Sequence, residues 1–465
     1  MSREWLRLRQ PATLGHSAAP SFFLATSLLF GAAFTVITPP FQVPDEPVHL
    51  FRAFTVSEGY ALPALGHPSP PQRIPQSISA QATLFTNRLT SSKKDRVRPQ
   101  ELAQALDAPL DPDRRVILSA GNTMGYSSLG YLPQAAGIGI GRVFSDSALM
   151  VLYAARLANV VVTSLLIWLA IVRARTSQWL LTLLALTPMA LFMRASASPD
   201  PLTMAIAFLF LGLVIGVATA ERTITKLDLA ALLLTSFLIP LTKPVYAPLA
   251  LAILVVPPSR SRNRNLAVFL PIVVLSAAIL GTGTASLWAR NVLAGVAGKS
   301  SVHASSQVDY AVHHPAETAV VIAQDYVTHL PRYLGHMIGR LGWLDTPLPL
   351  PILALYALTL LFLAVADRDR QPDWRIWQRM IFFIAGTLTL MLVSAALYAS
   401  WTPVGADHVE GIQGRYLLPL SPLLLLPLSI RRFSASSGRC ALIAAAVSLI
   451  TLCTTLWVLV QRYYA

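Results

Sequence analysis

A cluster of ionisable residues follows the first long apolar run of the chain, in the segment PPFQVPDEPVHLFRAF at 39–54. Two adjacent carboxylates, Asp45 and Glu46, stand between prolines, and His49 and Arg52 follow four and seven residues after Asp45. If a helix begins at the acids, Asp45, His49 and Arg52 share one of its faces. A carboxylate on such a face can act as a general base toward a hydroxyl group.

Two simpler roles remain open for the same cluster. Acids in a first helical turn satisfy free backbone N–H groups and suit the helix dipole, so capping alone would account for Asp45 and Glu46. Capping explains Glu46 more easily than Asp45. Asp45 and His49 are also donor types that can hold a divalent cation, although two ligands at this spacing are weak evidence for a metal.

Three cations stand at the predicted outer ends of apolar segments, where short loops disfavour Lys and Arg. They are Arg194 in MRASASPDPL, Lys243 in LTKPVYAPL and Arg415 in GIQGRYLLPL. Such side chains can reach back to lipid headgroups. They can instead bind a phosphate, because Arg offers a bidentate fork and Lys a point charge. Tyr416 stands beside Arg415 at the mouth of a predicted span.

Asp345 is a further candidate, in the segment LGHMIGRLGWLDTPLP at 334–349. It precedes a proline break and another apolar run, so it can either cap the next helix or face a site. Trp343 beside it is typical of a membrane-boundary anchor. The sequence contains no nucleotide-binding glycine fingerprint and no nucleophile elbow.

The elements that must position these residues are membrane spans. Of the 465 residues, 54% are hydrophobic and only 12% are charged, whereas soluble domains have about 25% charged residues. The net charge of +14 comes mostly from short basic groups between apolar runs. Membrane orientation produces that pattern, so nucleic-acid binding is not indicated.

We predict an all-α polytopic membrane protein with about eleven transmembrane helices, since a span needs roughly 20 apolar residues. A cytoplasmic tail, residues 1–20, precedes a single membrane domain, residues 21–465. The predicted spans lie near residues 21–38, 148–172, 178–194, 201–219, 227–241, 244–257, 266–288, 349–366, 378–398, 416–430 and 440–460.

A cytoplasmic N-terminus makes every second loop cytoplasmic, and all of those loops are basic, as the orientation rule requires. The C-terminus and two long segments, 39–147 and 289–348, then lie outside. In the first segment we expect a helix from the acids to Gly59 and an interfacial helix in GYSSLGYLPQAAGIGIGRVF. Between them we expect a polar, irregular middle at 62–115.

Six segments occur in the same order in a bacterial predicted membrane protein family, domain of unknown function 2142. The chain resembles that family from about residue 20 to 460, but Ser127 and Ser128 stand where the family tends to have prolines. The shared segments are PPFQVPDEPVHLFRA, YSSLGYLPQAAGIGIGR, ASPDPLTMAIAFL, TKPVYAPLAL, GRLGWLDTPLP and GIQGRYLLPLSPLLLL.

That family is itself similar to the GT-C class of polytopic glycosyltransferases. The resemblance implies a bacterial inner-membrane enzyme that takes a sugar from a polyprenyl-phosphate carrier on the outer side of the membrane. The acceptor would be an envelope glycan or lipid. The catalytic carboxylate would be Asp45 or Glu46, with the carrier phosphate held by cations among Lys243, Arg194 and Arg415. A divalent cation is the one cofactor suggested.

A non-catalytic role, as a transporter, flippase or assembly partner for envelope polysaccharide, is the alternative. Transporters are expected to carry ionisable residues in mid-span and interrupted helices in matching halves. In this sequence the charged residues cluster at span ends, which favours the enzyme. In that role His49 and Arg52 would orient the carboxylate or bind the acceptor.

Overall fold

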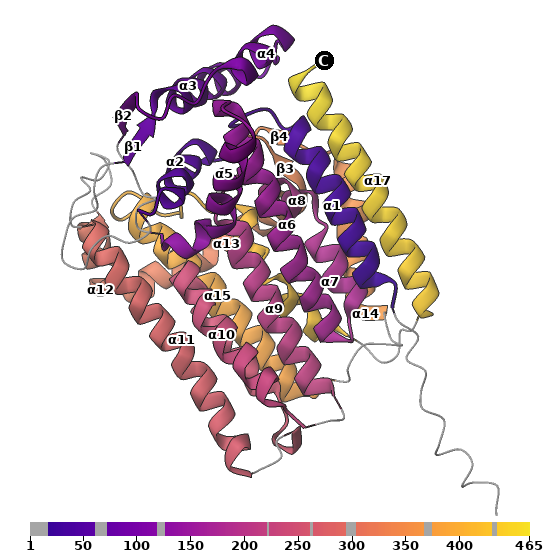
Figure 1. Ribbon diagram of the computed structural model, residues 1–465. Helices are drawn as coiled ribbons and strands as arrows, with labels where there is room; N and C mark the ends of the chain where they lie inside the picture. The colour runs from indigo at the N-terminus through magenta and orange to yellow at the C-terminus, as the bar shows by residue number, and fades with distance from the viewer. Residues whose placement is uncertain are drawn as a thin grey trace, which may run out of the picture.

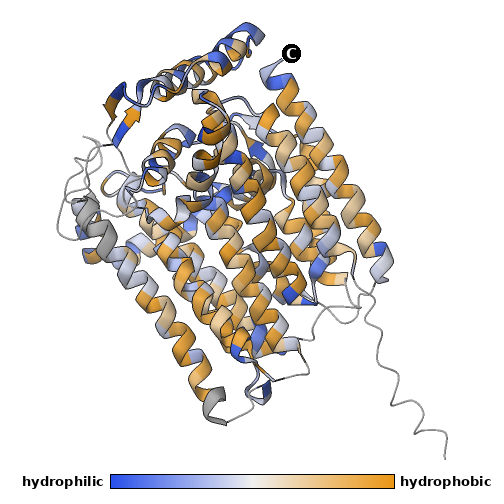
Figure 2. Cartoon of the chain, viewed as in Figure 1, coloured by the Kyte–Doolittle hydropathy of each residue, from blue (hydrophilic) through white to orange (hydrophobic). Residues whose placement is uncertain are grey.

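The computed structural model of the chain describes residues 17–60, 72–118, 126–220, 223–260, 264–293, 304–366, 374–429 and 435–465. Its long helices run side by side as a bundle (Figure 1), and the hydropathy colouring shows that they are mostly apolar (Figure 2). Within these residues, 6 helices are long and apolar enough to cross a membrane. They are α1 (Ala19–Ile37), α6 (Ala148–Ala174), α9 (Asp200–Thr219), α11 (Arg264–Leu293), α15 (Ile376–Trp401) and α17 (Ser437–Tyr463).

The other predicted spans are helical but short or broken, so a count of eleven full spans is not confirmed. Prolines are the cause, because each removes a backbone N–H from the helical ladder. Pro188 starts a new helix after Thr187, for example, and Pro248 lies inside a 3-10 helix. The short elements are α7 (Gln178–Ala185), α8 (Pro188–Arg194), α10 (Lys226–Thr242), η3 (Pro244–Val255), η4 (Pro258–Arg260), α14 (Leu350–Ala366), η6 (Gly414–Leu417), α16 (Ser421–Leu425) and η7 (Leu426–Leu428).

The first long segment is more regular than expected. The helices predicted at its two ends are confirmed, but the prediction of an irregular middle is wrong for the described part. There β1 pairs with β2 in antiparallel register, and α3 buries Ile78, Ala82, Phe85 and Leu89 along one face at helical spacing. The elements are α2 (Glu46–Ser57), β1 (Gln72–Pro75), α3 (Gln76–Ser91), α4 (Pro99–Asp107), β2 (Arg115–Leu118), η2 (Ser128–Tyr131) and α5 (Leu132–Phe144).

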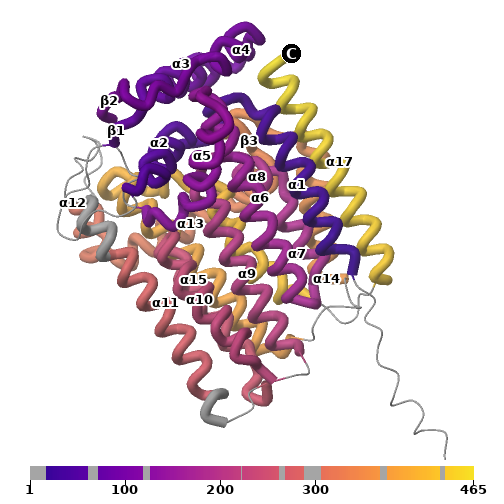
Figure 3. Tube along the Cα trace, in the orientation of Figure 1, coloured from indigo at the N-terminus to yellow at the C-terminus, as the bar shows by residue number. Residues whose placement is uncertain are grey.

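The first long segment and the C-terminus meet at one end of the bundle, which we call the Asp45 end (Figures 1 and 3). There Val97 donates its backbone N–H to the carbonyl of Tyr463 at 2.8 Å. The second long segment packs α13 against η6 at the same end. Its elements are α12 (Ala304–His313), α13 (Pro315–Gly339), β3 (Arg340–Leu341) and β4 (Thr346–Pro347).

Helix α9 is the centre of the bundle. Its apolar window is 89% buried within the protein, against 28% to 50% for the other five long helices. Gly212 and Gly216 let it lie directly on α6, because a Cβ at either position would collide with a backbone carbonyl of that helix. Since α9 begins at Asp200, that carboxylate lies at the Asp45 end.

Candidate functional site

A cavity of about 310 Å³ lies at the Asp45 end, and we call it the charged cavity. Its wall is formed by α2, the start of α9, the turn from α10 to η3, α15 and η6. Apolar side chains of α15, namely Val393, Ala396 and Leu397, form one side. The polar residues around it are Asp45, His49, Tyr126, Asp200, Lys243, Tyr246, Ser400, Arg415 and Tyr416.

Asp45 precedes α2 but does not cap it. Its backbone is left-handed, with φ of 64°, a conformation in which Asp is enriched among non-glycine residues. No capping hydrogen bond forms from its side chain. The carboxylate instead accepts a hydrogen bond from Arg415 Nη2 at 2.9 Å, and the side chain stays 46% exposed. Capping therefore does not account for Asp45.

Glu46 lies on the other side of the chain from the charged cavity. Its carboxylate is fully buried and accepts hydrogen bonds from Arg156 Nε at 2.8 Å and Arg156 Nη2 at 2.6 Å. It also accepts one from the backbone N–H of Ala197 at 3.1 Å. Glu46 thus neither caps α2 nor lines the cavity, and its contacts are those of a residue that positions its neighbours.

Two polar residues of α6 hold the chain on both sides of the charged cavity. Arg156 donates to the carbonyls of Thr35, Thr38 and Pro39, as well as to Glu46, so it fixes the turn that leads to Asp45. Asn159, one turn later, donates to two carbonyls of the segment 196–198, which leads into Asp200. One turn of α6 therefore positions both cavity carboxylates.

Sequence reasoning missed Arg156, although a signal was available. It lies inside the predicted span 148–172, and an ionisable residue within a span is expensive unless it is paired. It is an exception to the clustering of charged residues at span ends. The preference for an enzyme over a transporter on that ground is correspondingly weaker.

We expect Arg156→Met to destabilise the protein by about 3–5 kcal/mol, because it leaves the Glu46 carboxylate buried without its cation. Arg142→Met is the matched control, since Arg142 is partly exposed and lies 3.7 Å from Glu58, and such pairs contribute about 0–1 kcal/mol. Thermal unfolding in detergent compares the two variants. Equal losses would contradict a positioning role for the buried pair.

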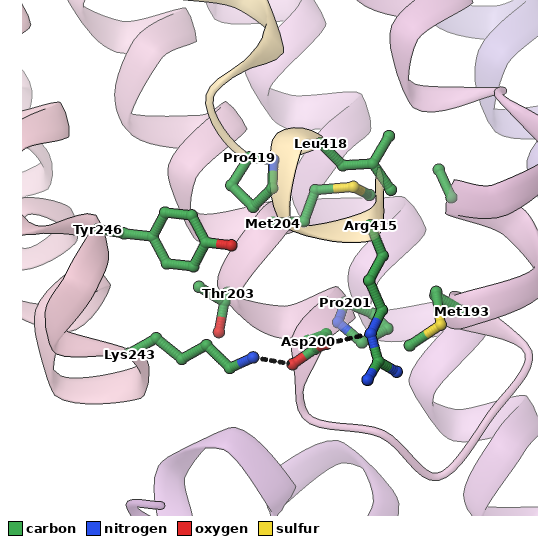
Figure 4. Close-up of a pocket in the computed structure, with 11 residues that line it drawn as sticks. Met193, Asp200, Pro201, Thr203, Met204, Lys243, Tyr246, Arg415, Leu418 and Pro419 are labelled. Carbon is green, nitrogen blue, oxygen red and sulfur yellow. Dashed lines mark ion pairs between the residues drawn. The ribbon is translucent and has the colours of Figure 1, made fainter. Parts of the chain in front are cut away.

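Asp200 is the second residue that sequence reasoning missed. Lys243 Nζ lies 2.5 Å from Asp200 Oδ1, and Arg415 Nε lies 3.7 Å from Asp200 Oδ2. Figure 4 shows the two cations reaching the carboxylate from opposite sides. In the sequence, Asp200 stood within the segment that contains Arg194, and an acid at the start of an apolar run resembles a helix cap.

Two nitrogens of the Arg415 guanidinium form no hydrogen bond within the described residues. The residue is only 7% exposed, and within the described residues its Nε and Nη1 atoms have no hydrogen-bond partner. The contact of Nε with Asp200, at 3.7 Å, is an ion pair that is too long for a hydrogen bond. Buried donors without partners cost about 1–3 kcal/mol each, so an anion that accepts from them would bind favourably.

Lys243 is also buried, at the turn between α10 and η3. Its ammonium group lies 5.3 Å from the centre of the Tyr126 ring and 5.4 Å from that of Tyr416. Tyr416 faces Arg415 as well, at 5.4 Å. Aromatic faces attract cations, so these rings help to keep both charges inside the cavity.

His49 and Arg52 are not equivalent, although both lie on α2. His49 lines the charged cavity, and its Nδ1 is hydrogen-bonded to Tyr131 Oη at 2.9 Å. Burial, reinforced by Arg415 and Lys243, lowers the pKa of His49 to about 4, so its ring is neutral near pH 7. Arg52 points elsewhere and donates to Ser128 Oγ at 2.9 Å.

Two other predicted site residues are not brought to this cavity. Arg194 is fully buried and donates to Ser27 Oγ and to the carbonyl of Ala185, because the end of α8 faces α1. Asp345 forms an ion pair with Arg462 of α17 at 3.0 Å. We therefore leave Arg194 out of the phosphate ligands and Asp345 out of the site.

The proposed metal pair also gains no further ligand. Across the described residues, no group of three or more His, Cys, Asp or Glu side chains is arranged to hold a metal ion. Asp45 already accepts from Arg415, and His49 Nδ1 is engaged with Tyr131.

Comparison with known proteins identifies a family but no characterised relative. The family model described as "Predicted membrane protein (DUF2142)" matches residues 28–424, which is well over half of the chain. No curated protein and no solved structure matches the chain significantly. The family resemblance inferred from the motifs is thereby confirmed: the chain belongs to the DUF2142 family of predicted membrane proteins.

Proposed function

We propose that this protein is a glycosyltransferase that moves a sugar from a polyprenyl-phosphate carrier to an envelope glycan or lipid. One observation carries the proposal. A half-exposed carboxylate, Asp45, lies in one cavity with two buried cations, Lys243 and Arg415, and two guanidinium nitrogens of Arg415 have no hydrogen-bond partner among the described residues. The resemblance to GT-C enzymes, which implies a catalytic carboxylate at this position, supports the same assignment.

The charged cavity also suits a ligand that is part phosphate and part hydrocarbon. Its cations lie at the α10–η3 turn and on η6, whereas α15 contributes Val393, Ala396 and Leu397. A carrier phosphate would bind to Lys243 and Arg415, and the first isoprene units would lie against α15. A soluble nucleotide sugar has no hydrocarbon chain that could bind to the apolar side of the cavity.

The reaction would proceed by a single displacement. An acceptor hydroxyl attacks the anomeric carbon, and Asp45 takes its proton as the new C–O bond forms. The bond from that carbon to the phosphate oxygen breaks, and its electron pair leaves with the phosphate. Lys243 and Arg415 stabilise the negative charge there, which is the kind of electrostatic effect that often dominates such steps. Because Arg415 would turn from Asp45 to the phosphate, donor binding frees the base.

The proposal includes a location and an orientation. The Asp45 end would lie on the outer side of a bacterial inner membrane, with a cytoplasmic N-terminus and the C-terminus outside, and the basic loops support this orientation. A polyprenyl-phosphate sugar displayed on the outer leaflet would then reach the charged cavity from the bilayer.

A carrier-translocating function is the second candidate, and one observation favours it. The predicted spans 178–194 and 416–430 are interrupted helices, and each has a buried arginine at one end, Arg194 or Arg415. Interrupted helices with charged groups near their breaks occur in transporters. This candidate predicts movement of the intact carrier across the bilayer without transfer of its sugar.

Proteoliposomes containing the purified protein can separate the two functions. The donor is a synthetic polyprenyl-phosphate sugar labelled in the sugar, and the acceptor is an envelope extract from a strain that lacks the gene. We expect label to enter the extract and free polyprenyl phosphate to appear in equal amounts. Translocation of the unaltered donor would establish the alternative, and a complete lack of both activities, across a panel of donor sugars, would overturn both.

A further inference from the structure

A second and larger cavity also lies at the Asp45 end. It is a groove of about 910 Å³ between the last turns of α1, the helix α5 and the first turns of α6, with α4 across it. Its lining is almost entirely apolar and includes Val36, Leu102, Leu106, Ile140 and Phe144. Small-molecule sites have volumes of about 300–1,000 Å³, so this groove, which we call the apolar groove, has room for a ligand.

The groove follows from the glycines of α5. A Cβ on Gly137 would collide with the carbonyl oxygen of Ala154, and a Cβ on Gly141 would collide with the side chain of the same residue. The glycines therefore let α5 lie directly on α6. Ile140 and Phe144 line the groove together with these glycines, and their side chains are left 60% and 83% exposed. Exposed apolar surface of this extent marks a site that contacts lipid or a partner.

The position of the groove along the membrane normal identifies the kind of ligand. It is bounded by the end of one candidate span, α1, and the beginning of another, α6. The ends of spans lie near the headgroups of a bilayer, where the first methylenes of the acyl chains also begin. The helix α4 crosses the groove at that level but, with 9 residues, is too short to span.

A basic turn adjoins the groove. Residues 93–98 contain Lys93, Lys94, Arg96 and Arg98 but only one acid. Arg98 directly precedes α4, and Leu102 and Leu106, which line the groove, lie in the turns of α4 that follow. Arg98 is mostly exposed and lies 3.5 Å from the Glu101 carboxylate, and Lys93 and Lys94 are exposed too. Positive charge therefore stands at the edge of an apolar groove at headgroup level.

We propose that the apolar groove binds the acyl chains of an anionic phospholipid, whose headgroup phosphate contacts Lys93, Lys94 and Arg98. The lipid would hold the α3–α4 segment against the membrane surface. The inference does not depend on the proposed sugar transfer, because none of these residues lines the charged cavity.

Native mass spectrometry of the detergent-purified protein tests this, with phosphatidylglycerol and phosphatidylcholine of identical acyl chains as probes. We expect tighter retention of phosphatidylglycerol. Replacing Lys93, Lys94 and Arg98 with Gln should weaken binding of phosphatidylglycerol by about fivefold for each cation removed. Binding of phosphatidylcholine, whose choline group cancels the charge of its phosphate, should change far less. Equal retention of the two lipids by the unaltered protein would overturn the charge-based part of the proposal.

A second variant tests the groove itself. Ala136→Trp fills it from an exposed position of α5, and Ala446→Trp makes the same change at an exposed position of α17. We expect only the first to lose bound phosphatidylglycerol, with both variants unfolding at similar temperatures. Full retention by Ala136→Trp would refute the site. Displacement of phosphatidylglycerol by equimolar polyprenyl phosphate would show that the groove belongs to the carrier instead.

Discussion

Replacing Asp45 with Asn should lower sugar transfer from a polyprenyl-phosphate donor by about 10²–10⁴-fold, the usual contribution of a general base. An amide has nearly the shape of the carboxylate, and its oxygen can still accept the hydrogen bond from Arg415 Nη2. It cannot take a proton from the acceptor hydroxyl. Because the Asp45 side chain is 46% exposed, the fold should tolerate the change. The measurement is labelled sugar transferred per minute in proteoliposomes.

The matched control for this variant is Asp407→Asn. Asp407 lies just beyond the end of α15 at the Asp45 end, and its side chain is 95% exposed. It should transfer sugar at the unaltered rate. If Asp45→Asn also kept that rate, the carboxylate would not be the base, and the proposed mechanism would be wrong.

The sequence predicted many residues of the charged cavity, because polar residues are conspicuous beside the long apolar runs of a membrane protein. Asp45, His49, Lys243, Arg415 and Tyr416 were all selected from the sequence, and all five line the same cavity. The reasoning was that a charge at the end of an apolar run is costly and needs an explanation. Their chemical roles stay a prediction, but their proximity is a property of the fold.

The same reasoning could not decide where a side chain points. Asp45 and Glu46 are neighbours, yet the left-handed backbone of Asp45 leaves its carboxylate at the cavity while Glu46 turns to Arg156. Arg194 and Arg415 have similar sequence contexts, but only Arg415 faces the cavity. Orientation around a helix depends on which neighbours pack against it, and one sequence without its tertiary contacts does not contain that information.

The fold shows a comparable limit. Hydropathy located the apolar segments correctly, since each has a helical counterpart in the described structure. It did not show which of them are continuous helices. Pro244 and Pro248 make a 3-10 helix of the segment after Lys243, which places that lysine at a turn instead of inside a span. Both cavity cations lie at such interruptions, because Lys243 is at the α10–η3 turn and Arg415 is in the 3-10 helix η6.

Asp200 gives the most discriminating test of phosphate binding, because the cavity holds two carboxylates and two cations. In the structure Asp200 forms ion pairs with both Lys243 and Arg415. A phosphate that binds to these cations must therefore compete with Asp200. Two unit charges 4 Å apart interact by about 4 kcal/mol at an effective dielectric constant of 20, so this competition is substantial.

We therefore expect Asp200→Asn to bind polyprenyl phosphate at least about tenfold more tightly and to be less stable when empty. The substitution leaves two buried cations without their shared carboxylate, and the phosphate supplies the missing charge. Lys243→Met should do the opposite and weaken binding by about 10–100-fold, as expected for loss of a charged hydrogen bond. The measurement is the rise in unfolding temperature with polyprenyl phosphate, compared with that caused by polyprenol, which has no phosphate.

Asp325→Asn provides the control for Asp200→Asn, because both remove a buried carboxylate. Asp325 lies on α13, where it accepts from Tyr333 Oη at 2.7 Å and has no ion pair with either cavity cation. It should lose stability without gaining affinity for the phosphate. If Asp200→Asn lost phosphate binding as Lys243→Met does, Asp200 would be a support that holds the cations in place, and competition would be excluded. A gain confined to Asp200→Asn would instead mean that the carboxylate occupies the phosphate position until the carrier arrives.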